Sequence, residues 1–448
     1  MKKFYNRTEQ ISAFRDTSNN IGNTTAKLSV VVGRRRVGKT RLIKEAFNHC
    51  KHLYFFVSRK SERALVDEFK DIIVTELNAK FFSPNSLKDI LEFLLDYAKN
   101  NPITIIFDEF QDIEKINTGF YSELQNLWDQ YKQDSKMHLV VCGSIYNLMS
   151  GIFKGKDEPL FNRDDYYYHI KPLTPSYIKQ VMEDEGRFDD ESYLQWWCLS
   201  GGIPKYIEWI ASTNKNKDTI EQLITSSSPL IKEGIHRLVE DFGDEHRTYF
   251  DILGAIASGH NTKPKVENYL GYQINDAFPK LVESFEIINR VRSMDAKETS
   301  KTYRYEIADP FLRFWFRFIY KNRSAVEMGN YPYIKDIIRR DYKTYSGFEF
   351  EQLIKEILRE SMQFNKIGSF WDRKGENEID IVAINDPQKK IVSIEAKRQK
   401  KNYNEQALLM KVTYALSKLK LQGYSVEHKC VALDELPVFL DEYQPQTL

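Results

Sequence analysis

Two groups of residues in this sequence have types and spacings suited to chemistry on phosphates. The first is the turn GRRRVGKT, in which four residues separate Gly33 from Gly38, Lys39 and Thr40. Glycines let backbone N–H groups curl around a polyphosphate, and a following helix adds its dipole. The lysine of such a loop reaches the β- and γ-phosphates, and the hydroxyl binds Mg²⁺. The pattern predicts a site for ATP and Mg²⁺ built on these four residues.

An acidic pair follows at the end of an apolar run. In ITIIFDEFQDI, residues 103 to 107 have the composition of a buried strand, and Asp108 and Glu109 stand at its carboxyl end. Ligands bind at this end of the strands in open α/β sheets. We expect Asp108 to hold the metal ion and Glu109 to polarise the attacking water, which favours hydrolysis over binding alone. The alternative is a strand that merely ends in a charged turn.

The second group lies in EIDIVAINDPQKKIVSIEAK, residues 378 to 397. Asp380, Glu395 and Lys397 each stand in or at the end of a run with strand character. Residues two apart on a strand share a face, so Glu395 and Lys397 are expected to point together toward Asp380. Paired acids can hold Mg²⁺, and a lysine can orient water or neutralise a developing phosphorane. The alternative is an ordinary surface sheet on which Glu and Lys mix.

Weaker candidates surround the nucleotide motifs. Ser144 ends the apolar run MHLVVCGS and is placed to sense the γ-phosphate or the water, although strands often end in Gly-Ser turns. Arg163, in LFNRDD, is a candidate finger arginine that stabilises the transferring phosphate. Its equally weighted alternative is a surface ion pair with Asp164 or Asp165. The arginines at 34–36 are expected to face solvent or a partner.

The elements that must position these residues follow from periodicity. A β-branched strand is predicted over 28–32, a helix with apolar positions Leu42, Ile43 and Phe47 follows the glycine-rich turn, and further strands run over 103–107 and 137–144. Near the other end we predict a helix over 347–360, three strands, a helix over 403–419 and a last strand, HKCVAL. The fold class is therefore α/β with several domains.

Composition limits the classes of protein. The chain has 448 residues, 42% of them apolar and 29% charged, which is typical of a globular protein of several domains. The 65 basic and 64 acidic residues nearly cancel, so nucleic-acid binding must come from local patches. No run is long and apolar enough to span a membrane, and four scattered cysteines fit a reducing compartment. We expect a cytoplasmic protein without a membrane partner.

Several motifs together resemble a known family, the archaeal-type P-loop ATPases related to the AAA+ and STAND groups. The resemblance covers the first half of the chain and rests on FYNRTEQISAF, GRRRVGKT, IIFDEFQ, VVCGS, LFNR and SGGIPKYIEWI, in this order. It implies that a Gly-x-Pro turn, here Gly202 to Pro204, opens a helix of a lid bundle close to the nucleotide. Pro204 is included among the nucleotide-binding residues on this ground alone.

The middle of the chain predicts a winged helix. Helices in RTYFDILGAIASG, PKVENYLG and INDAFPKLVESF precede two strands, EIINRVRS and KTYRYEIA. The resemblance agrees, because this family usually carries such a domain here. The third helix has Lys280 as its only base, and Pro279 would kink or shorten it. A helix that reads a major groove should be basic, so internal docking or protein contact is slightly favoured over DNA reading.

The predicted αβββαβ order of the last part matches the core of the restriction-endonuclease-like fold. Asp380 and the Glu395-Ala396-Lys397 triplet fall where the PD-(D/E)XK nucleases carry theirs, and the resemblance implies Glu351, on the preceding helix, as a further metal ligand. Similar folds also bind nucleic acid without cutting it, so cleavage and binding alone remain equally weighted.

These observations predict an ATP-hydrolysing switch coupled to a metal-dependent, nuclease-like domain. The expected domains are a P-loop ATPase core (1–172), a helical lid (173–235), a winged helix (236–315) and the nuclease-like domain (316–448). Nucleic acid, DNA first, is the expected partner, and self-association is left open. The alternative is an ATP-dependent regulatory or oligomerising protein whose last domain only binds nucleic acid or protein.

Overall fold

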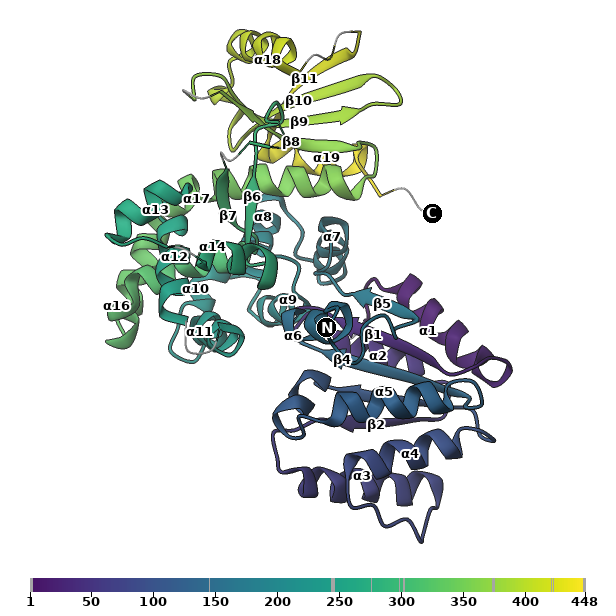
Figure 1. The fold of residues 1–448 in the computed structure, drawn as a ribbon. Coiled ribbons are helices and arrows are strands. Elements are labelled where there is room, and N and C mark those ends of the chain that lie inside the picture. Colours follow the sequence, from purple (N-terminus) through teal and green to yellow (C-terminus); the bar gives the residue numbers. More distant parts are fainter. Residues whose placement is uncertain are drawn as a thin grey trace. The chain divides into compact units, whose positions relative to one another are not determined.

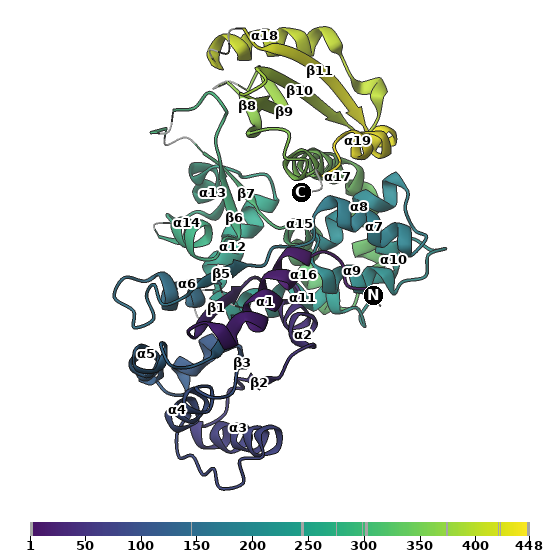
Figure 2. The same cartoon turned by 90° about the vertical axis from the view of Figure 1, so that its right-hand side faces the viewer.

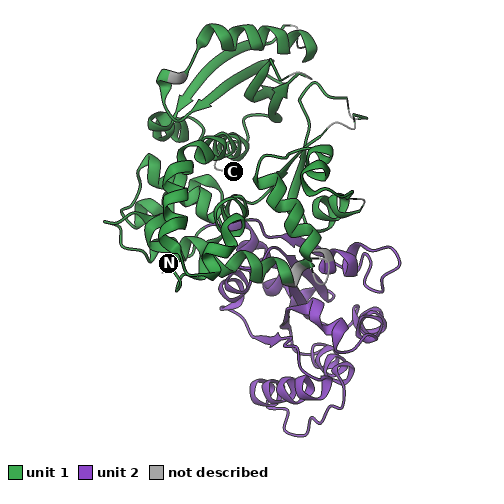
Figure 3. Ribbon diagram, turned by 90° about the vertical axis from the view of Figure 1, so that its left-hand side faces the viewer, with its two compact units in different colours: residues 1–5, 172–448 green, residues 6–171 purple. Residues whose placement is uncertain are grey.

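The computed structural model describes residues 3–144, 146–242, 246–274, 276–297, 299–300, 303–372, 375–419, 421 and 423–445. The chain forms two compact units, one of residues Asn6–Lys171 and one of Met1–Tyr5 with Pro172–Leu448 (Figure 3). The predicted lid, winged-helix and nuclease-like domains all fall in the larger unit.

The smaller unit is built on a five-stranded parallel sheet with the order β2-β3-β4-β1-β5. Strands β3 and β4 are buried along their whole length, which explains their continuous apolar runs. The sheet register pairs Val32 with Gly143 and Asp108 with Cys142, so β1, β3 and β4 end together at one edge. The parallel sheet confirms the predicted α/β class. The elements are α1 Thr8–Asn20, β1 Lys27–Val32, α2 Lys39–Phe47, β2 His52–Phe56, α3 Glu62–Leu77, α4 Leu87–Tyr97, β3 Ile103–Asp108, α5 Phe120–Tyr131, β4 Met137–Gly143, α6 Tyr146–Lys154 and β5 Tyr166–His169.

The larger unit begins with helices and a short hairpin. Helices α12, α13 and α14 come directly before the antiparallel strands β6 and β7, in the order expected for the middle of the chain. The third, α14, is only three residues long and continues as a π-helical turn over Lys280–Ser284, which agrees with the shortening expected at Pro279. The elements are α7 Pro175–Asp184, α8 Asp190–Ser200, α9 Pro204–Ala211, α10 Thr219–Leu223, α11 Pro229–Phe242, α12 His246–Ala257, α13 Lys263–Leu270, α14 Ala277–Pro279, β6 Ile288–Val291, β7 Arg304–Ile307, α15 Pro310–Phe314 and α16 Arg323–Glu327.

A second sheet forms the last part of the larger unit, with the order β11-β10-β9-β8. Strands β8, β9 and β10 are antiparallel neighbours, and β11 pairs with β10 in parallel. Helices α17 and α18 lie on opposite faces of this sheet (Figures 1 and 2). Side chains of β9 alternate between the two faces: Val382 and Ile384 pack with Leu408 of α18, whereas Ile381 and Ala383 belong to the core shared with α17. The elements are α17 Tyr331–Glu360, β8 Lys366–Trp371, β9 Glu378–Asn385, β10 Lys390–Lys397, α18 Glu405–Leu419, β11 Ser425–Ala432 and α19 Leu436–Glu442.

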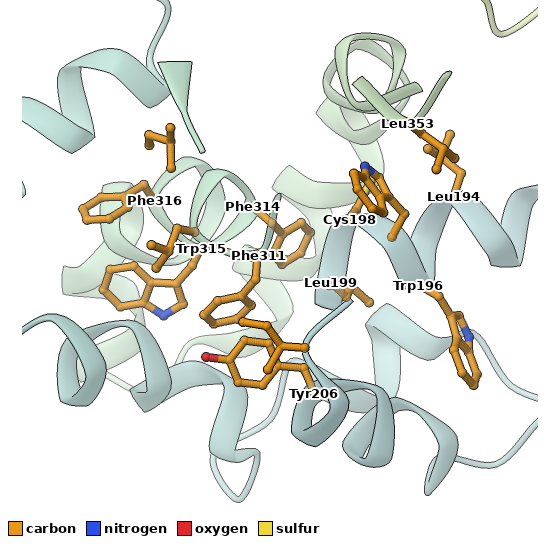
Figure 4. Close-up of a cluster of buried hydrophobic side chains, with 14 of the residues drawn as sticks. Leu194, Trp196, Cys198, Leu199, Tyr206, Phe311, Phe314, Trp315, Phe316 and Leu353 are labelled. Carbon is orange, nitrogen blue, oxygen red and sulfur yellow. The ribbon is translucent and has the colours of Figure 1, made fainter. Parts of the chain in front are cut away.

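One hydrophobic core runs through the larger unit and crosses the three predicted domain limits. Its aromatic centre joins α8 and α9 to α15, the π-helical turn that follows, and α17, and Tyr206 and Phe311 meet there with ring centroids 4.5 Å apart (Figure 4). Aromatic rings bury large areas and so hold these elements firmly together. Figure 4 labels Leu194, Trp196, Cys198, Leu199, Tyr206, Phe311, Phe314, Trp315, Phe316 and Leu353.

The predicted helix over 347–360 was too short. Helix α17 begins at Tyr331, where the side chain of Asn330 accepts a hydrogen bond from the Tyr333 N–H and Pro332 occupies the first turn. Capping by Asn and a proline in the first turn are both favourable starts for a helix. Gly347 is tolerated inside the helix.

Among the residues that the structure describes, no helix combines the length and the apolar character that crossing a membrane requires.

Candidate functional site

The glycine-rich turn folds tightly between β1 and α2. Gly38 has φ 95° and caps α2 in the left-handed region, which glycine adopts without strain. A Cβ atom on Gly33 would lie 2.5 Å from the carbonyl oxygen of Ile170, so only glycine fits there. Lys39 is buried, and its ammonium donates to the carbonyl oxygens of Gly33 (2.8 Å) and Arg34 (3.2 Å). The Lys39 ammonium thus lies inside the loop and is hydrogen-bonded to the loop's own backbone.

Asp108 is the point at which three elements of the nucleotide site meet. Its Oδ2 accepts hydrogen bonds from the Thr40 hydroxyl (2.8 Å) and from the Tyr54 hydroxyl (2.6 Å). Its Oδ1 accepts from the backbone N–H of Glu109 (3.0 Å). A hydroxyl beside a carboxylate is an oxygen set that suits Mg²⁺, so Thr40 and Asp108 fit the expected cation.

Glu109 is held in a strained conformation between two amide or hydroxyl donors. Its φ of 57° lies in the left-handed region, which is costly for a residue with a side chain. Its Oε2 accepts hydrogen bonds from Gln111 Nε2 (2.7 Å) and Ser144 Oγ (2.7 Å). Ser144 therefore contacts the predicted base, and both are fixed at the carboxyl edge of the sheet.

The environment of Asp108 shifts the pKa of its neighbours. Burial, followed by the hydrogen bond to Asp108, raises the pKa of Tyr54 far above its usual value, so Tyr54 stays a proton donor. Burial and then the charge of Asp108 likewise raise the pKa of the Cys142 thiol. Both Tyr54 and Cys142 therefore stay neutral.

Arg163 is engaged with another part of the smaller unit. Its guanidinium donates to both carboxylate oxygens of Asp129, at 3.1 and 2.8 Å, and to the carbonyl oxygen of Pro159. The expected alternative partners are paired elsewhere: Asp164 with Lys154, and Asp165 with lysines of β1 and of the segment after α5. The structure thus places Arg163 in an ion pair that the sequence did not predict. Pro204 opens α9 as its first residue, but it belongs to the other unit.

The second site lies where β9 and β10 stop pairing. Their ladder ends with Ile381 opposite Ile394, so Asp380 and Glu395 are the next residues on the two strands. The carboxylate of Asp380 instead accepts a hydrogen bond from the Ala396 N–H at 3.2 Å. At this fork, where the backbone pairing of β9 and β10 ends, side chains from the two strands come together.

Lys397 joins the two carboxylates at the fork. Its ammonium lies 3.1 Å from Glu395 Oε1 and 3.6 Å from Asp380 Oδ2. Burial alone would lower the pKa of Lys397, but Asp380 and Glu395 outweigh it and raise that pKa. The three predicted residues Asp380, Glu395 and Lys397 therefore lie together, and the Lys397 ammonium lies between the two carboxylates.

Glu351 contributes a further carboxylate from α17. Burial, and then the charge of Asp380, raises the pKa of Glu351 to about 8. Burial also raises the pKa of Asp380, opposed by Lys397. Within the described residues, no group of three or more His, Cys, Asp or Glu side chains is gathered closely enough to hold a metal ion. Carboxylates with raised pKa values are nonetheless groups that a cation would deprotonate.

The hairpin of the middle region packs against this sheet. Arg304 of β7 pairs with Glu378 of β9 and lies over the Trp371 ring, 4.1 Å from its centroid. The Met294 N–H donates to the Ser369 carbonyl oxygen of the edge strand β8 at 3.1 Å. These contacts cover an edge that would otherwise offer unpaired backbone groups.

Sequence reasoning missed two residues of the nucleotide site. Tyr54 reaches Asp108 from β2, and this contact depends on β2 and β3 being neighbours, which no local pattern reveals. Gln111 stands inside the quoted motif IIFDEFQ, two residues after Glu109, so its position was available as a signal.

Comparisons with known proteins extend over most of the chain. A family profile described as an ATPase domain predominantly from Archaea matches residues 4–210, and one described as Archaea bacterial proteins of unknown function matches residues 315–408. The Uncharacterized protein MJECL04 of Methanocaldococcus jannaschii is 30% identical over 414 residues, 88% of this chain and 87% of the relative.

Solved structures resemble the chain at lower identity. The Walker-type ATPase PABY2304 of Pyrococcus abyssi aligns with a TM-score of 0.53 and 19% identity over 70% of this chain and 96% of that chain, so the two share a fold. The Aeropyrum pernix ORC2 protein aligns with a TM-score of 0.46 and 13% identity over 73% and 96%. The chain belongs to the family of archaeal-type ATPases that join an ATPase domain to a C-terminal domain of unknown function.

Proposed function

We propose that this ATPase is a switch that hydrolyses ATP and controls a metal-dependent, nuclease-like site in its C-terminal domain. The observation that carries the second half is the meeting of Asp380, Glu395 and Lys397 where β9 and β10 separate. Two carboxylates and one ammonium at a single point can hold a cation and neutralise charge on a phosphodiester.

In the ATPase half, each residue has one role. Lys39 exchanges the carbonyl oxygens of Gly33 and Arg34 for phosphate oxygens, because its donors are already at the loop. Thr40 and Asp108 would hold Mg²⁺, which supplies charge neutralisation to the phosphates when bound. Glu109 accepts the proton of the attacking water, since Gln111 and Ser144 fix its carboxylate and leave its second oxygen for water.

In the C-terminal half, Asp380 and Glu395 would hold a divalent cation. Glu351 interacts electrostatically with Asp380 and would have to approach the other two carboxylates to become a third ligand. Lys397 would then leave its two ion pairs and orient water or stabilise the pentacovalent phosphate. The αβββαβ order and the parallel pairing of β10 with β11 support a restriction-endonuclease-like fold.

The middle region supports internal docking rather than groove reading. Three helices and a hairpin favour a winged helix, but the wing residues Met294 and Arg304 contact β8 and β9. The third helix, which would read a groove, is three residues long before its π-helical turn. We therefore assign nucleic-acid contact to the C-terminal domain, with DNA as the first substrate to test.

The test is cleavage of plasmid, linear and single-stranded DNA and of RNA, with Mg²⁺ or Mn²⁺, with and without ATP. Wild type is compared with Asp380→Ala, with Lys39→Ala, and with Asp434→Ala, which removes an exposed carboxylate from the same domain. We expect metal-dependent cutting that Asp380→Ala abolishes and Asp434→Ala leaves intact. Loss of ATP hydrolysis with a change of cutting in Lys39→Ala would show that ATP controls the site.

A second candidate function, binding or oligomerisation without cleavage, is favoured if Lys397 keeps its two ion pairs and no divalent cation binds between the carboxylates. Both carboxylates already have a cationic partner, as in a domain that binds without cutting. Equal behaviour of wild type and Asp380→Ala on every substrate, with ATP hydrolysis intact, would refute the nuclease and leave an ATP-dependent binding or oligomerising protein.

A further inference from the structure

Helix α17 carries a row of charged residues that leads away from the C-terminal site. Glu351, Lys355 and Arg359 follow at four-residue spacing, and residues four apart lie on one face of a helix. Glu351 interacts electrostatically with Asp380 at the start of the row. At its end, the side chain of Arg359 is 50% exposed. The row thus connects the carboxylates to the surface of the last helical turn.

Lys355, in the middle, is buried without a direct partner. It is only 7% exposed, and within the described residues its ammonium makes no hydrogen bond or ion pair. Its nitrogen nevertheless is not fully buried and still reaches solvent. Burial lowers the pKa of Lys355, while the more distant carboxylates of Glu306, Glu351 and Asp380 oppose that effect.

One of these carboxylates, that of Glu306, lies on strand β7. Tyr305 and Ile307 are buried, whereas Arg304 and Glu306, on the alternate positions, are only half-buried. Arg304 reaches Glu378 of β9, and Glu306 acts on Lys355 of α17. One face of the hairpin therefore borders the same region as Glu351 and Asp380.

The side chain of Lys355 is largely buried, but its ammonium still reaches solvent and makes no hydrogen bond or ion pair within the described residues, so it can bind an anionic ligand there. We propose that Lys355 is a second phosphate-binding cation of the C-terminal site, contacting the nucleic-acid backbone beside the phosphodiester that Lys397 would engage. This assignment rests on the function proposed above. The ligand group is a backbone phosphate, because its oxygens are the anions that accompany the bond to be cut.

The test measures binding of fluorescently labelled duplex DNA, single-stranded DNA and RNA by the full-length protein, with Ca²⁺ in place of Mg²⁺ and over a series of salt concentrations. The variant is Lys355→Met, which keeps most of the side-chain volume. Lys343→Met removes an exposed lysine from the same helix and serves as the matched control. Lys355→Arg tests whether a restored positive charge restores binding.

We expect Lys355→Met to weaken binding about tenfold or more, as for the loss of one charge-assisted contact. The slope of log K against log salt should fall by about 0.7 to 0.9, because one phosphate contact is lost. The control should keep the wild-type slope. Thermal stability and ATP hydrolysis of Lys355→Met should not fall, because the variant removes no hydrogen bond or ion pair within the described residues.

Two different failures are distinguishable. If wild type binds these nucleic acids and Lys355→Met keeps the wild-type affinity and slope, the assignment of Lys355 is wrong and the proposed function stands. If Lys355→Met unfolds at lower temperature and Lys355→Arg does not recover binding, the residue has a structural role and the assignment is also wrong. If wild type binds none of the three, both the proposed function and the assignment fall.

Discussion

Replacing Tyr54 by phenylalanine removes a hydroxyl that donates to Asp108 Oδ2 at 2.6 Å. Thr40 donates to the same oxygen. In the site proposed above, Thr40 would turn toward Mg²⁺, and the hydrogen bond from Tyr54 would then keep Asp108 oriented. A hydrogen bond to a charged group contributes about 1.5–3 kcal/mol, which corresponds to a factor of about 10 to 100 in an equilibrium constant. Loss of an outer hydrogen bond to a metal ligand typically weakens metal binding by the same factor.

The assay is ATP hydrolysis as a function of free Mg²⁺ at saturating ATP. We expect Tyr54→Phe to raise the half-saturating Mg²⁺ concentration about 10- to 100-fold and to leave the rate at saturating Mg²⁺ much less affected. Tyr131→Phe is the matched control, since that hydroxyl also donates to a carboxylate, Glu92, but between surface helices. An unchanged Mg²⁺ dependence in Tyr54→Phe would refute the role assigned to this hydrogen bond.

Two further predictions concern stability and pH. Arg237→Met should lower the free energy of unfolding by about 3–5 kcal/mol, because it removes the ion pair that Arg237 makes at 2.7 Å with Asp309, whose side chain is 2% exposed. Denaturant unfolding measures this change. As a control, Arg339→Met breaks an exposed ion pair and should lower the free energy of unfolding by less than about 1 kcal/mol. Glu351 has its pKa raised from 4.5 to about 8, so the folded state binds more protons than the unfolded one and stability without divalent cations should fall as pH rises between these values. Thermal unfolding over that range should show a shallower fall for Glu351→Gln, and equal slopes would contradict the burial of this carboxyl.

The positions of the main residues of the candidate nucleotide site could be predicted from sequence because they depend on local patterns. A turn between a strand and a helix fixes Lys39 and Thr40, and an apolar run that ends in two acids fixes Asp108 and Glu109. The parallel register then brings these ends to one edge of the sheet, as the α/β class requires. The contact of Tyr54 with Asp108 could not be predicted in this way, because it depends on the order of the strands, and that order depends on contacts between distant segments.

The pairing of Arg163 could not be predicted for the same reason. Neighbouring acids suggested Asp164 or Asp165, but the guanidinium reaches back to Asp129 on α5. The two nearer acids are taken by lysines from other elements. A choice among ion pairs is decided by tertiary packing, which sequence separation does not measure.

The beginning of α17 was missed because its apolar residues do not form one stripe. Ile334 and Ile338 are buried in its first half, and Phe350, Ile354 and Leu358 in its second half, and the helix as a whole contacts α7, α8, α16, β8, β9 and β10. A helix covered by several neighbours in turn loses the one-sided periodicity by which helices are recognised. The shorter stretch that faces the sheet kept enough of that pattern to be predicted.

For the switch proposed above, helix α17 provides a physical connection between α7, α8 and the C-terminal site. At its end, Glu360 accepts hydrogen bonds from Ser176 at the start of α7, including one from the Ser176 N–H at 3.0 Å. Further back along the helix, Arg398, which directly follows Lys397, donates to Ser346 of α17 at 2.6 Å and pairs with Glu191 of α8. Packed cores move between discrete arrangements rather than deforming smoothly. We therefore infer that a shift of α7 and α8 would move α17 and the end of β10 together and would change the ion pairs of Lys397.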